Sequence, residues 1–330
     1  MKPSLTRKDF LRAATAALGA VALPATRAAA KFPERPLKLV VPFSAGGTAD
    51  VLARVVAQHW SPQLGQSIVI ENKGGAGGNL GAELVAKAPA DGYTLLYGSV
   101  SNFAMNLGLY KKLPYAPLTD FAPVGMVLQI PIVLVASPAL GVKDFDGFIK
   151  LLKANPGKYN YGSAGNGSSA HIACHLLLRQ TGTEAVHVPY KGNAAALQDI
   201  MAGSVALGVA SVTAAEALVR AGKLQALAAI STTRLPAFAQ LPTTRELGLK
   251  DYDAYSWNAI AAPAGTPVPV LDTLNQTLRQ ALRGNELRAA LDKQGVVPLP
   301  DYTREATAAY FKAQVDKWVP IVRASGAQVD

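Results

Sequence analysis

The sequence predicts two α/β domains, and three observations lead to that prediction. Strand-like and helix-like apolar patterns alternate along the chain, which is typical of parallel α/β architecture. The alternation pauses near residue 136 and restarts at residue 145, as expected where a second domain begins. The chain has 330 residues, of which 50% are hydrophobic and 16% are charged, so two domains with cores of their own can form.

The first thirty residues have the pattern of a removable export signal. Positive residues come first, an apolar stretch follows from Ala13 to Ala25, and Ala28–Ala30 fits cleavage after small residues. The apolar stretch is shorter than the roughly twenty residues that a bilayer span needs. The segment Thr6–Leu11 resembles a twin-arginine signal with Lys8 in place of the second arginine, so Sec and Tat export both stay open. We therefore expect residues 1–30 to be removed and the mature protein to be periplasmic.

The charge of the mature chain does not indicate a nucleic-acid partner. Residues 1–30 hold five Lys or Arg and one Asp, so their removal lowers the formal net charge from +10 to +6. The remaining positive residues are scattered, without a basic run. Cys174 is the only cysteine, which excludes an intrachain disulfide, and its apolar helical context predicts a buried thiol.

The first α/β pattern begins directly after the export signal. Apolar residues at helical spacing follow the first two strands, from Val51 to Trp60 and from Leu80 to Val85. Pro131 separates the last two strands of this half. The expected strands are Leu37–Val41, Ser67–Glu71, Tyr93–Tyr97, Val124–Leu128 and Ile132–Ala136.

The second pattern begins with a helix and ends before a proline-rich stretch. Thr213 and Glu216 form a capping box for its last helix, which ends at Gly222. A strand-like return then carries Trp257, which we expect in the core, and two terminal helices follow. The expected elements are helix Phe145–Ala154, strand Lys158–Tyr161, a helix to Gln180, strand Ala185–Val188, helix Ala194–Met201, strand Val205–Ala210, strand Leu224–Ile230, and the terminal helices through Leu271–Leu282 and Phe311–Val322.

Three glycine-rich junctions lie between a strand and a helix, at residues 43–48, 74–79 and 162–168. Helix N-termini have unpaired N–H groups and a positive dipole end, so they bind anions without a cationic side chain. Glycines allow close approach of a ligand to the backbone, and Ser44, Ser163 and Ser168 add neutral donors. Three such junctions, with at least one in each half, predict an anion-binding site between the halves.

Other kinds of site fit the sequence less well. Gly165, Gly167 and Ala170 match a dinucleotide fingerprint, but the acidic residue for the ribose is missing. His171 and His175 have the spacing of zinc ligands, without the general-base Glu. No triad, P-loop or metal cluster is evident, so we expect no cofactor and no metal. A hydrolase using Ser163 or Ser168 stays an alternative. Asp50 is a helix cap or a ligand contact, and Tyr190 or Lys191 could face an anion.

The chain resembles the Bug substrate-binding proteins, the extracytoplasmic receptors of tripartite tricarboxylate transporters. The resemblance covers the whole mature chain and is carried by PFSAGGTAD, ENKGGAGGNLGAELVAKAPADGYTLLYGS, YGSAGNGSSAH, VHVPYKGNAAALQDIMAGSV and APAGTP, in this order. It implies a periplasmic-binding-protein fold, a Venus flytrap with two α/β domains around a central cleft. We assign residues 31–131 with 255–330 to the first domain and residues 132–254 to the second.

The resemblance also implies a ligand and a site. Family members bind small carboxylates, gripped by one strand–turn–helix junction from each domain with ordered waters. These junctions fall here at Phe43–Gly47 and Ser163–Gly167. His171 matches a common family residue, whereas His175 stands where Glu is usual. The family often has an Asp near Ala210, and its absence here favours a carboxylate without an ammonium group.

The prediction is therefore a solute-binding protein and not an enzyme, a monomer that hands its ligand to a tripartite tricarboxylate-type permease. A sensor that presents its closed form to a membrane signalling protein is the alternative. We expect no nucleic-acid partner and no membrane span. The expected ligand-binding residues are Phe43, Ser44, Ala45, Gly46, Gly47, Asn79, Ser99, Ser101, Asn102, Ser163, Ala164, Gly165, Asn166, Gly167, His171 and Tyr190.

Overall fold

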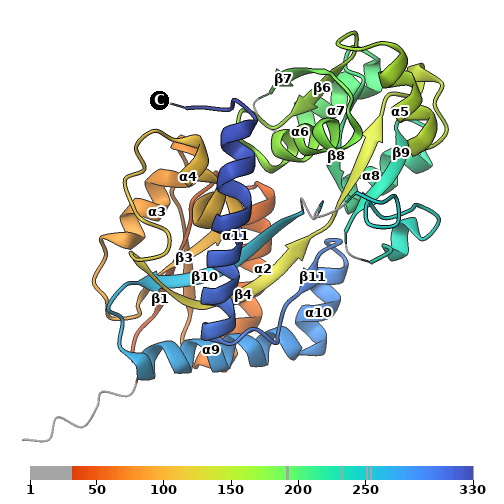
Figure 1. Cartoon of the computed structure of the whole chain (residues 1–330). Coiled ribbons are helices and arrows are strands. Elements are labelled where there is room, and N and C mark those ends of the chain that lie inside the picture. Colours follow the sequence, from red (N-terminus) through yellow and green to blue (C-terminus); the bar gives the residue numbers. More distant parts are fainter. Residues whose placement is uncertain (1–31, 191–192, 232, 250–251, 253–254, 330) are drawn as a thin grey trace, which may run out of the picture.

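The computed structural model describes residues 32–190, 193–231, 233–249, 252 and 255–329. The expected export signal, residues 1–30, lies outside this part of the chain, as does Lys191. Two domains are evident, each built around one sheet, with strands passing between them (Figure 1). None of the helices in the described part of the chain has both the length and the apolar character that a membrane span requires.

The first domain contains a six-stranded sheet in the order β11–β4–β10–β3–β1–β2. Its strands are β1 Leu37–Val41, β2 Ile68–Asn72, β3 Thr94–Ser99, β4 Phe121–Ile130, β10 Ser256–Pro263 and β11 Val297–Pro298. Side chains alternate between two cores: Leu37, Leu39 and Val41 enter one, and Val40 enters the other. Burial on both faces explains the nearly continuous apolar sequence of β1.

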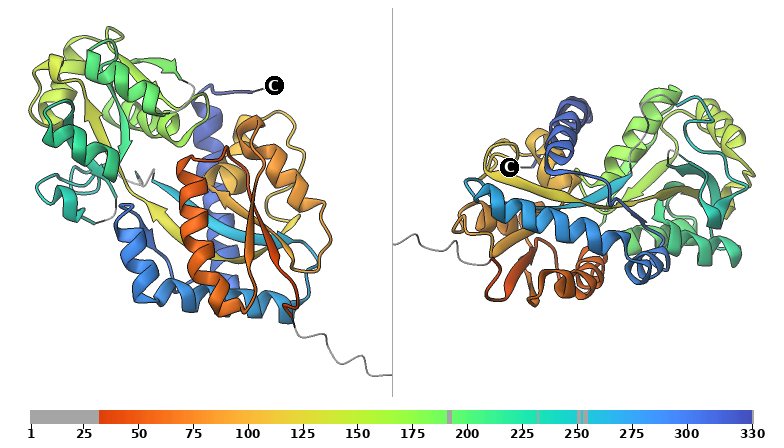
Figure 2. Two further views of the ribbon diagram at one scale, coloured as in Figure 1. Left: turned by 180° about the vertical axis from the view of Figure 1, so that it is seen from behind. Right: turned by 90° about the horizontal axis from the view of Figure 1, so that it is seen from below.

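Helices cover both faces of this sheet. Seen from behind, α2, α9 and α10 lie on the face opposite α11 (Figure 2). The helices are α2 Thr48–Leu64, α3 Asn79–Ala86, α4 Asn106–Leu109, α9 Val268–Arg283, α10 Asn285–Asp292 and α11 Arg304–Ala324, with a 3₁₀ turn at Ala76–Gly78 and a π-helical turn at Ser101–Met105. The sequence pattern did not reveal α10 or β11.

The second domain contains a five-stranded sheet in the order β7–β6–β8–β5–β9. Its strands are β5 Ile132–Ala136, β6 Asn160–Ser163, β7 Val186–Pro189, β8 Leu207–Ser211 and β9 Gln225–Ile230. Its helices are α5 Phe145–Ala154, α6 Ser169–Thr181, α7 Asn193–Ala202 and α8 Val212–Arg220, with 3₁₀ turns at Pro138–Leu140 and Pro236–Phe238. Most expected elements in this half are present within about two residues of their predicted bounds.

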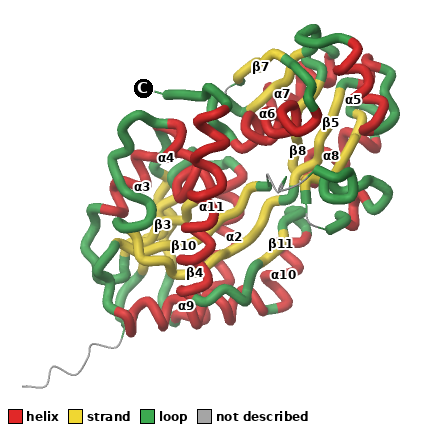
Figure 3. The backbone as a smooth tube through the Cα atoms, viewed as in Figure 1, coloured by secondary structure: helices red, strands yellow, loops and turns green. Residues whose placement is uncertain are grey.

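The chain crosses between the domains through β4 and β5 and returns along β10 (Figure 3). Pro131 separates β4 from β5, because proline has no N–H with which to continue a strand ladder. Both sheets are mixed, since the crossing strands run antiparallel to their neighbours: β10 is antiparallel to β3 and β4, and β5 is antiparallel to β8 and β9. The domain boundaries that we assign from the sequence stay a prediction.

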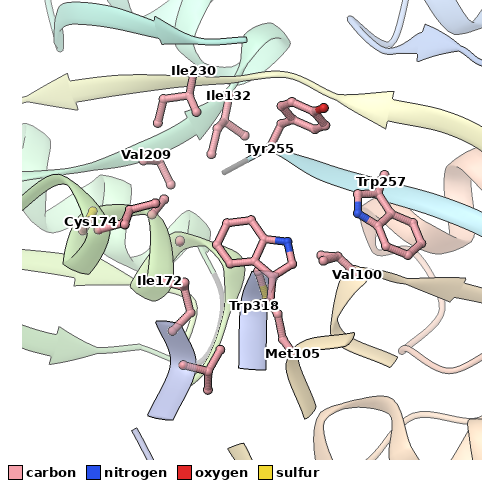
Figure 4. Packing of buried hydrophobic residues seen from close by; sticks show 14 of the residues in the cluster. Val100, Met105, Ile132, Ile172, Cys174, Val209, Ile230, Tyr255, Trp257 and Trp318 are labelled. Atoms are coloured by element: carbon pink, nitrogen blue, oxygen red, sulfur yellow. The ribbon is translucent and has the colours of Figure 1, made fainter. Parts of the chain in front are cut away.

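An apolar cluster joins the two domains beside the crossing strands. It includes Trp257 and Trp318, Ile172 of α6, and Ile230 of β9 (Figure 4). Both indole N–H groups donate to the side-chain oxygen of Gln314, at 3.0 Å from Trp257 and 2.8 Å from Trp318. The expectation that Trp257 belongs to the core is confirmed, since it is fully buried.

Two local expectations have different outcomes. The capping box at Thr213 is wrong: α8 begins at Val212, and the Ser211 hydroxyl accepts the N–H of Ala214 as the N-cap. The Thr213 hydroxyl instead donates across the domains to the Gln294 carbonyl, at 2.8 Å. Cys174 is a buried free thiol as expected, and burial raises its pKa to about 12.

Candidate functional site

A cavity of about 520 Å³ lies between the domains, at the ends of β1, β3 and β6 where α2 and α6 begin. Carboxyl ends of parallel strands meet at one edge of a sheet, and ligands of open α/β sheets bind beyond that edge. The lining residues are Phe43, Ser44, Gly47, Thr48, Ala49, Gly77, Ser99, Ser101, Asn106, Leu109, Tyr110, Ile130, Ala164, Asn166, Gly167, Ser168, Ser169, Ser256 and Asn258.

The N-terminus of α2 forms one wall of the cavity. Gly47 is the N-cap, with φ −78° and ψ 168°, and it provides no side-chain cap. Thr48 and Ala49, the first two helical residues, line the cavity. The first N–H groups of a helix have no partner within it, so these two point a pair of donors and the positive dipole end toward the cavity.

Asp50 holds the loop that leads into α2. Its buried carboxylate accepts the Gly46 N–H at 2.8 Å, the Arg54 Nε–H at 3.1 Å and the Asn72 amide at 3.0 Å. Asn72 also donates to the Phe43 carbonyl at 3.2 Å. Arg54, followed by the Gly46 N–H, lowers the pKa of Asp50 to about 2, so the carboxylate is charged and its charge is neutralised locally. Asp50 is therefore not the expected helix cap, because Gly47 is the N-cap of α2; its carboxylate instead holds the preceding loop through Gly46.

Asp50→Ala is expected to lower the free energy of unfolding by about 2–3 kcal/mol, because Gly46, Arg54 and Asn72 all lose an acceptor. Urea titration at pH 7 measures this loss. Asp316→Ala breaks the exposed Asp316–Lys312 pair, which has the same i,i+4 spacing, and should cost less than about 0.5 kcal/mol. On folding, the pKa of Asp50 falls from its ordinary value of 3.8 to about 2. The contribution of Asp50 to the free energy of unfolding is therefore full above pH 3.8 and is lost as the pH falls toward 2. Equal losses in both variants would contradict this role.

The N-terminus of α6 forms the facing wall. The Ser168 hydroxyl accepts the His171 N–H at 3.2 Å as the N-cap, and Ser169 is the first helical residue. Gly167 has a φ of +70°, and a Cβ there would lie 2.2 Å from Leu109 Cδ2. Leu109 belongs to α4 of the first domain, so Gly167 is a point of close contact between the domains across the cavity.

Two histidines hold the loop between β6 and α6. At one end, the Ser163 hydroxyl lies 2.7 Å from His187 Nε2 and is itself fully buried. At the other end, His171 Nδ1 accepts the Gly167 N–H at 3.1 Å. The two imidazoles stack with centroids 3.9 Å apart and planes 5° from parallel. Burial first, and then His187 and His175, lower the pKa of His171 to about 4, so the ring is neutral at pH 7.

A buried amide network extends from the lining residue Asn106 into the first domain. The Asn106 amide donates to Asn79 Oδ1 at 2.6 Å and to the Gly77 carbonyl at 3.2 Å. The Tyr115 hydroxyl donates to the Asn79 side chain or the Asn102 carbonyl, at 3.1 and 3.0 Å. Asn102 Oδ1 accepts the Ser99 N–H at 3.1 Å. This network holds the second glycine-rich loop against the end of β3.

The structure places the expected ligand-binding residues in two groups. Half of them are not among the lining residues: Ala45, Gly46, Asn79, Asn102, Ser163, Gly165, His171 and Tyr190. Five of these, Gly46, Asn79, Asn102, Ser163 and His171, hold the loops that line the cavity through the hydrogen bonds given above. The Tyr190 hydroxyl donates to Asp199 at 2.5 Å, which raises the pKa of Tyr190 to about 12. Those that line the cavity are Phe43, Ser44, Gly47, Ser99, Ser101, Ala164, Asn166 and Gly167.

Several lining residues escaped the sequence reasoning. Thr48, Ala49 and Ser169 could have been found, because they directly follow the N-caps of two expected helices. Other residues gave no local signal, since the tertiary structure brings them to the cavity from distant segments. These are Asn106, Leu109, Tyr110, Ile130, Ser256 and Asn258.

The cavity suits a small anion without using cationic side chains. Among its described lining residues there is no Lys, Arg, His, Asp or Glu, and the only titratable one is Tyr110, whose pKa burial raises. Its polar groups are hydroxyls, amides and two opposed helix N-termini. No cluster of three or more His, Cys, Asp or Glu that could hold a metal ion occurs within the residues that the structure covers.

Comparisons with known proteins identify relatives over most of the chain. Residues 52–327 match the family described as "Tripartite tricarboxylate transporter family receptor". The chain is also 37% identical over 302 residues to Protein BugT of Bordetella pertussis (strain Tohama I), a match that covers 90% of this chain and 91% of BugT.

Two solved structures are similar in both sequence and fold. Rpa4515 of R. palustris, described with adipate, is 35% identical with a TM-score of 0.80, covering 90% of this chain and 100% of that one. MatC of Rhodopseudomonas palustris, described with bound malate, is 33% identical with a TM-score of 0.76, covering 88% of this chain and 100% of that one.

Proposed function

Because the chain belongs to the tripartite tricarboxylate transporter receptor family, we propose that it captures a small carboxylate between its two domains and delivers it to a membrane permease of that transporter type. Members of this family are periplasmic solute-binding proteins and not enzymes. Residues 1–30 would then direct export and be removed. One observation carries the proposal: two helix N-termini, one from each domain, face a single cavity.

A carboxylate in this cavity would accept hydrogen bonds from the N–H groups of both helices. On one side these are the N–H groups of Thr48 and Ala49, and on the other that of Ser169. Because these N–H groups belong to different domains, the ligand favours the arrangement of the domains in which it contacts the N–H groups of both helices. Binding would thereby stabilise the closed form that a permease can recognise.

The lining residues also favour a class of carboxylate. An ammonium group needs an anionic partner when it leaves water, and no Asp or Glu is present among the described residues of the lining. The serine and amide groups near β3 and β10 would contact the remainder of the ligand. We therefore propose a mono- or dicarboxylate without an ammonium group, a class that includes the adipate and malate named for the relatives.

Calorimetry on ligand-stripped protein at pH 7 tests this function. Titration with adipate, malate, succinate, glutarate and benzoate should give at least one dissociation constant in the micromolar range. Aspartate and glutamate should bind at least about tenfold more weakly than malate and glutarate, because their ammonium group lacks a partner. No binding across a broad carboxylate panel would contradict the proposal, and preferred binding of the amino acids would contradict the ligand class.

A hydrolase remains the alternative that one contact favours. The 2.7 Å separation of Ser163 Oγ and His187 Nε2 is the distance that a nucleophile and its base require. Ser163 is fully buried, however, and within the described residues no carboxylate bonds to His187. We expect no turnover of p-nitrophenyl acetate above that of Ser163→Ala, whereas a Ser163-dependent burst would support the hydrolase.

A sensor role uses the same closed form, so the choice of partner needs a cellular test. If the protein serves a tripartite transporter, deletion of its gene should abolish uptake of the radiolabelled ligand found by calorimetry. A sensor would leave uptake intact and instead lose ligand-dependent transcription.

A further inference from the structure

The loop between β6 and α6, residues 164–168, has an arrangement that carboxylate binding alone does not explain. It forms one wall of the cavity through Ala164, Asn166, Gly167 and Ser168. His171 bonds the Gly167 N–H, and His187 bonds the hydroxyl of Ser163, the residue before the loop, which also accepts the Gly165 N–H at 3.1 Å. The two imidazoles are stacked on each other and on Tyr161, whose ring lies 4.9 Å from that of His187. Neither histidine is among the lining residues, so the pair lies behind the wall and not in it.

The hydrogen bonds define the protonation state of His171. A backbone N–H can only donate, so His171 Nδ1, which lies 3.1 Å from the Gly167 nitrogen, must be an unprotonated acceptor. The proton of the neutral ring is then on Nε2. A second proton would have to bind at Nδ1, and it would remove the acceptor and leave the Gly167 N–H without its partner.

The surroundings of the pair oppose that second proton. The titratable groups around His171 are Tyr161 on β6, His187 on β7, and Cys174 and His175 on α6, with Arg179 acting on His175. Within the described residues, none of these groups is a carboxylate. A positive charge on His171 would therefore lie against a second imidazole in a buried site with no compensating anion.

We propose that His171 and His187 are positioning residues for ligand binding. His171 bonds the Gly167 N–H at one end of the β6–α6 loop. His187 bonds the Ser163 hydroxyl, which accepts the Gly165 N–H at the other end, so the pair places the N–H groups of the loop toward the cavity. This inference rests on the proposed carboxylate binding for its affinity measurement only. The hydrogen bond to His171 gives Gly167 a defined position, and Gly167 is also where the loop meets Leu109 of the other domain. Displacement of the loop would thus disturb both the ligand wall and the contact between domains.

Two substitutions of His171 separate the hydrogen bond from the packing. Asn places its side-chain oxygen near the position of Nδ1, so His171→Asn keeps the acceptor and loses the stacked ring. Phe keeps a stacked ring and removes the acceptor. At pH 7, His171→Asn should bind malate or adipate within about threefold of the original chain, and His171→Phe at least tenfold more weakly. His187→Gln and His187→Phe form the corresponding pair at Ser163, and His175→Phe, one turn further along α6, is the control expected to leave affinity unchanged.

If neither malate nor adipate binds, or if a variant fails to fold, a measurement on the ligand-free original chain tests the proposal. In ¹⁵N NMR of the original chain, the Gly167 amide resonance should titrate with the same midpoint as the His171 ring. The Gly182 amide, at the other end of α6, should not follow that titration. Affinity retained in both Phe variants, or a Gly167 amide that does not follow His171, would overturn the proposal. Failure of the carboxylate panel together with a coupled titration would instead contradict only the proposed ligand.

Discussion

Replacing Gly167 by alanine is expected to weaken carboxylate binding by about a hundredfold, which corresponds to about 2.7 kcal/mol. The new Cβ would lie 2.2 Å from Leu109 Cδ2, and Leu109 is 4% exposed and cannot easily move away. Because the two residues belong to different domains, the clash is relieved by separating the domains. Calorimetry with the tightest carboxylate of the panel measures the loss.

Two further variants distinguish this clash from backbone strain. Gly182 has a φ of +62° at the C-cap of α6, and a Cβ there meets no atom within 4 Å. Gly182→Ala should therefore cost about 1 kcal/mol of stability and leave affinity unchanged. Combining Gly167→Ala with Leu109→Ala removes the obstructing side chain and should restore most of the affinity. An equal loss in Gly167→Ala and Gly182→Ala would show that the contact across the cavity has no part in binding.

Proline at the first residue of either cavity helix is expected to weaken carboxylate binding by about ten- to a hundredfold. Proline is well tolerated at this position, since its φ suits a helix and the missing N–H has no partner in the helix. The preceding residues, Gly47 and Ser168, already have extended ψ values of 168° and 155°, which proline requires. Thr48→Pro and Ser169→Pro thus each delete one donor, and a hydrogen bond to a charged group contributes about 1.5–3 kcal/mol.

The matched control lies on a helix far from the cavity. Asn285 is the exposed first residue of α10 and also follows a residue with extended ψ, 134° at Gly284. Asn285→Pro should leave both stability and affinity within error of the original chain, as judged by thermal unfolding and calorimetry. If Thr48→Pro and Ser169→Pro also bind normally, the ligand does not contact the helix N-termini.

Much of the local structure could be predicted because its causes are local. The five apolar residues of β1, the helical spacing from Val51 to Trp60 and the stop at Gly284 each depend on neighbours within a few residues. The two helices whose N-termini line the cavity, α2 and α6, were likewise expected from the glycine-rich junctions before them. The capping box at Thr213 failed because Ser211, two residues earlier, caps the same helix and leaves Thr213 to contact the other domain.

By itself, the sequence determined that this chain forms α/β domains with glycine-rich turns before helices, since apolar periodicity and backbone conformation are properties of short segments. Only the tertiary structure decided which turns face each other and what holds them. The register that pairs Val41 with Asn72 brings Asn72 to the Asp50 loop, and the register that pairs Tyr161 with His187 brings His187 to Ser163. In each case the two paired residues lie on different strands. Their proximity follows from strand order and register, which no short stretch of sequence encodes.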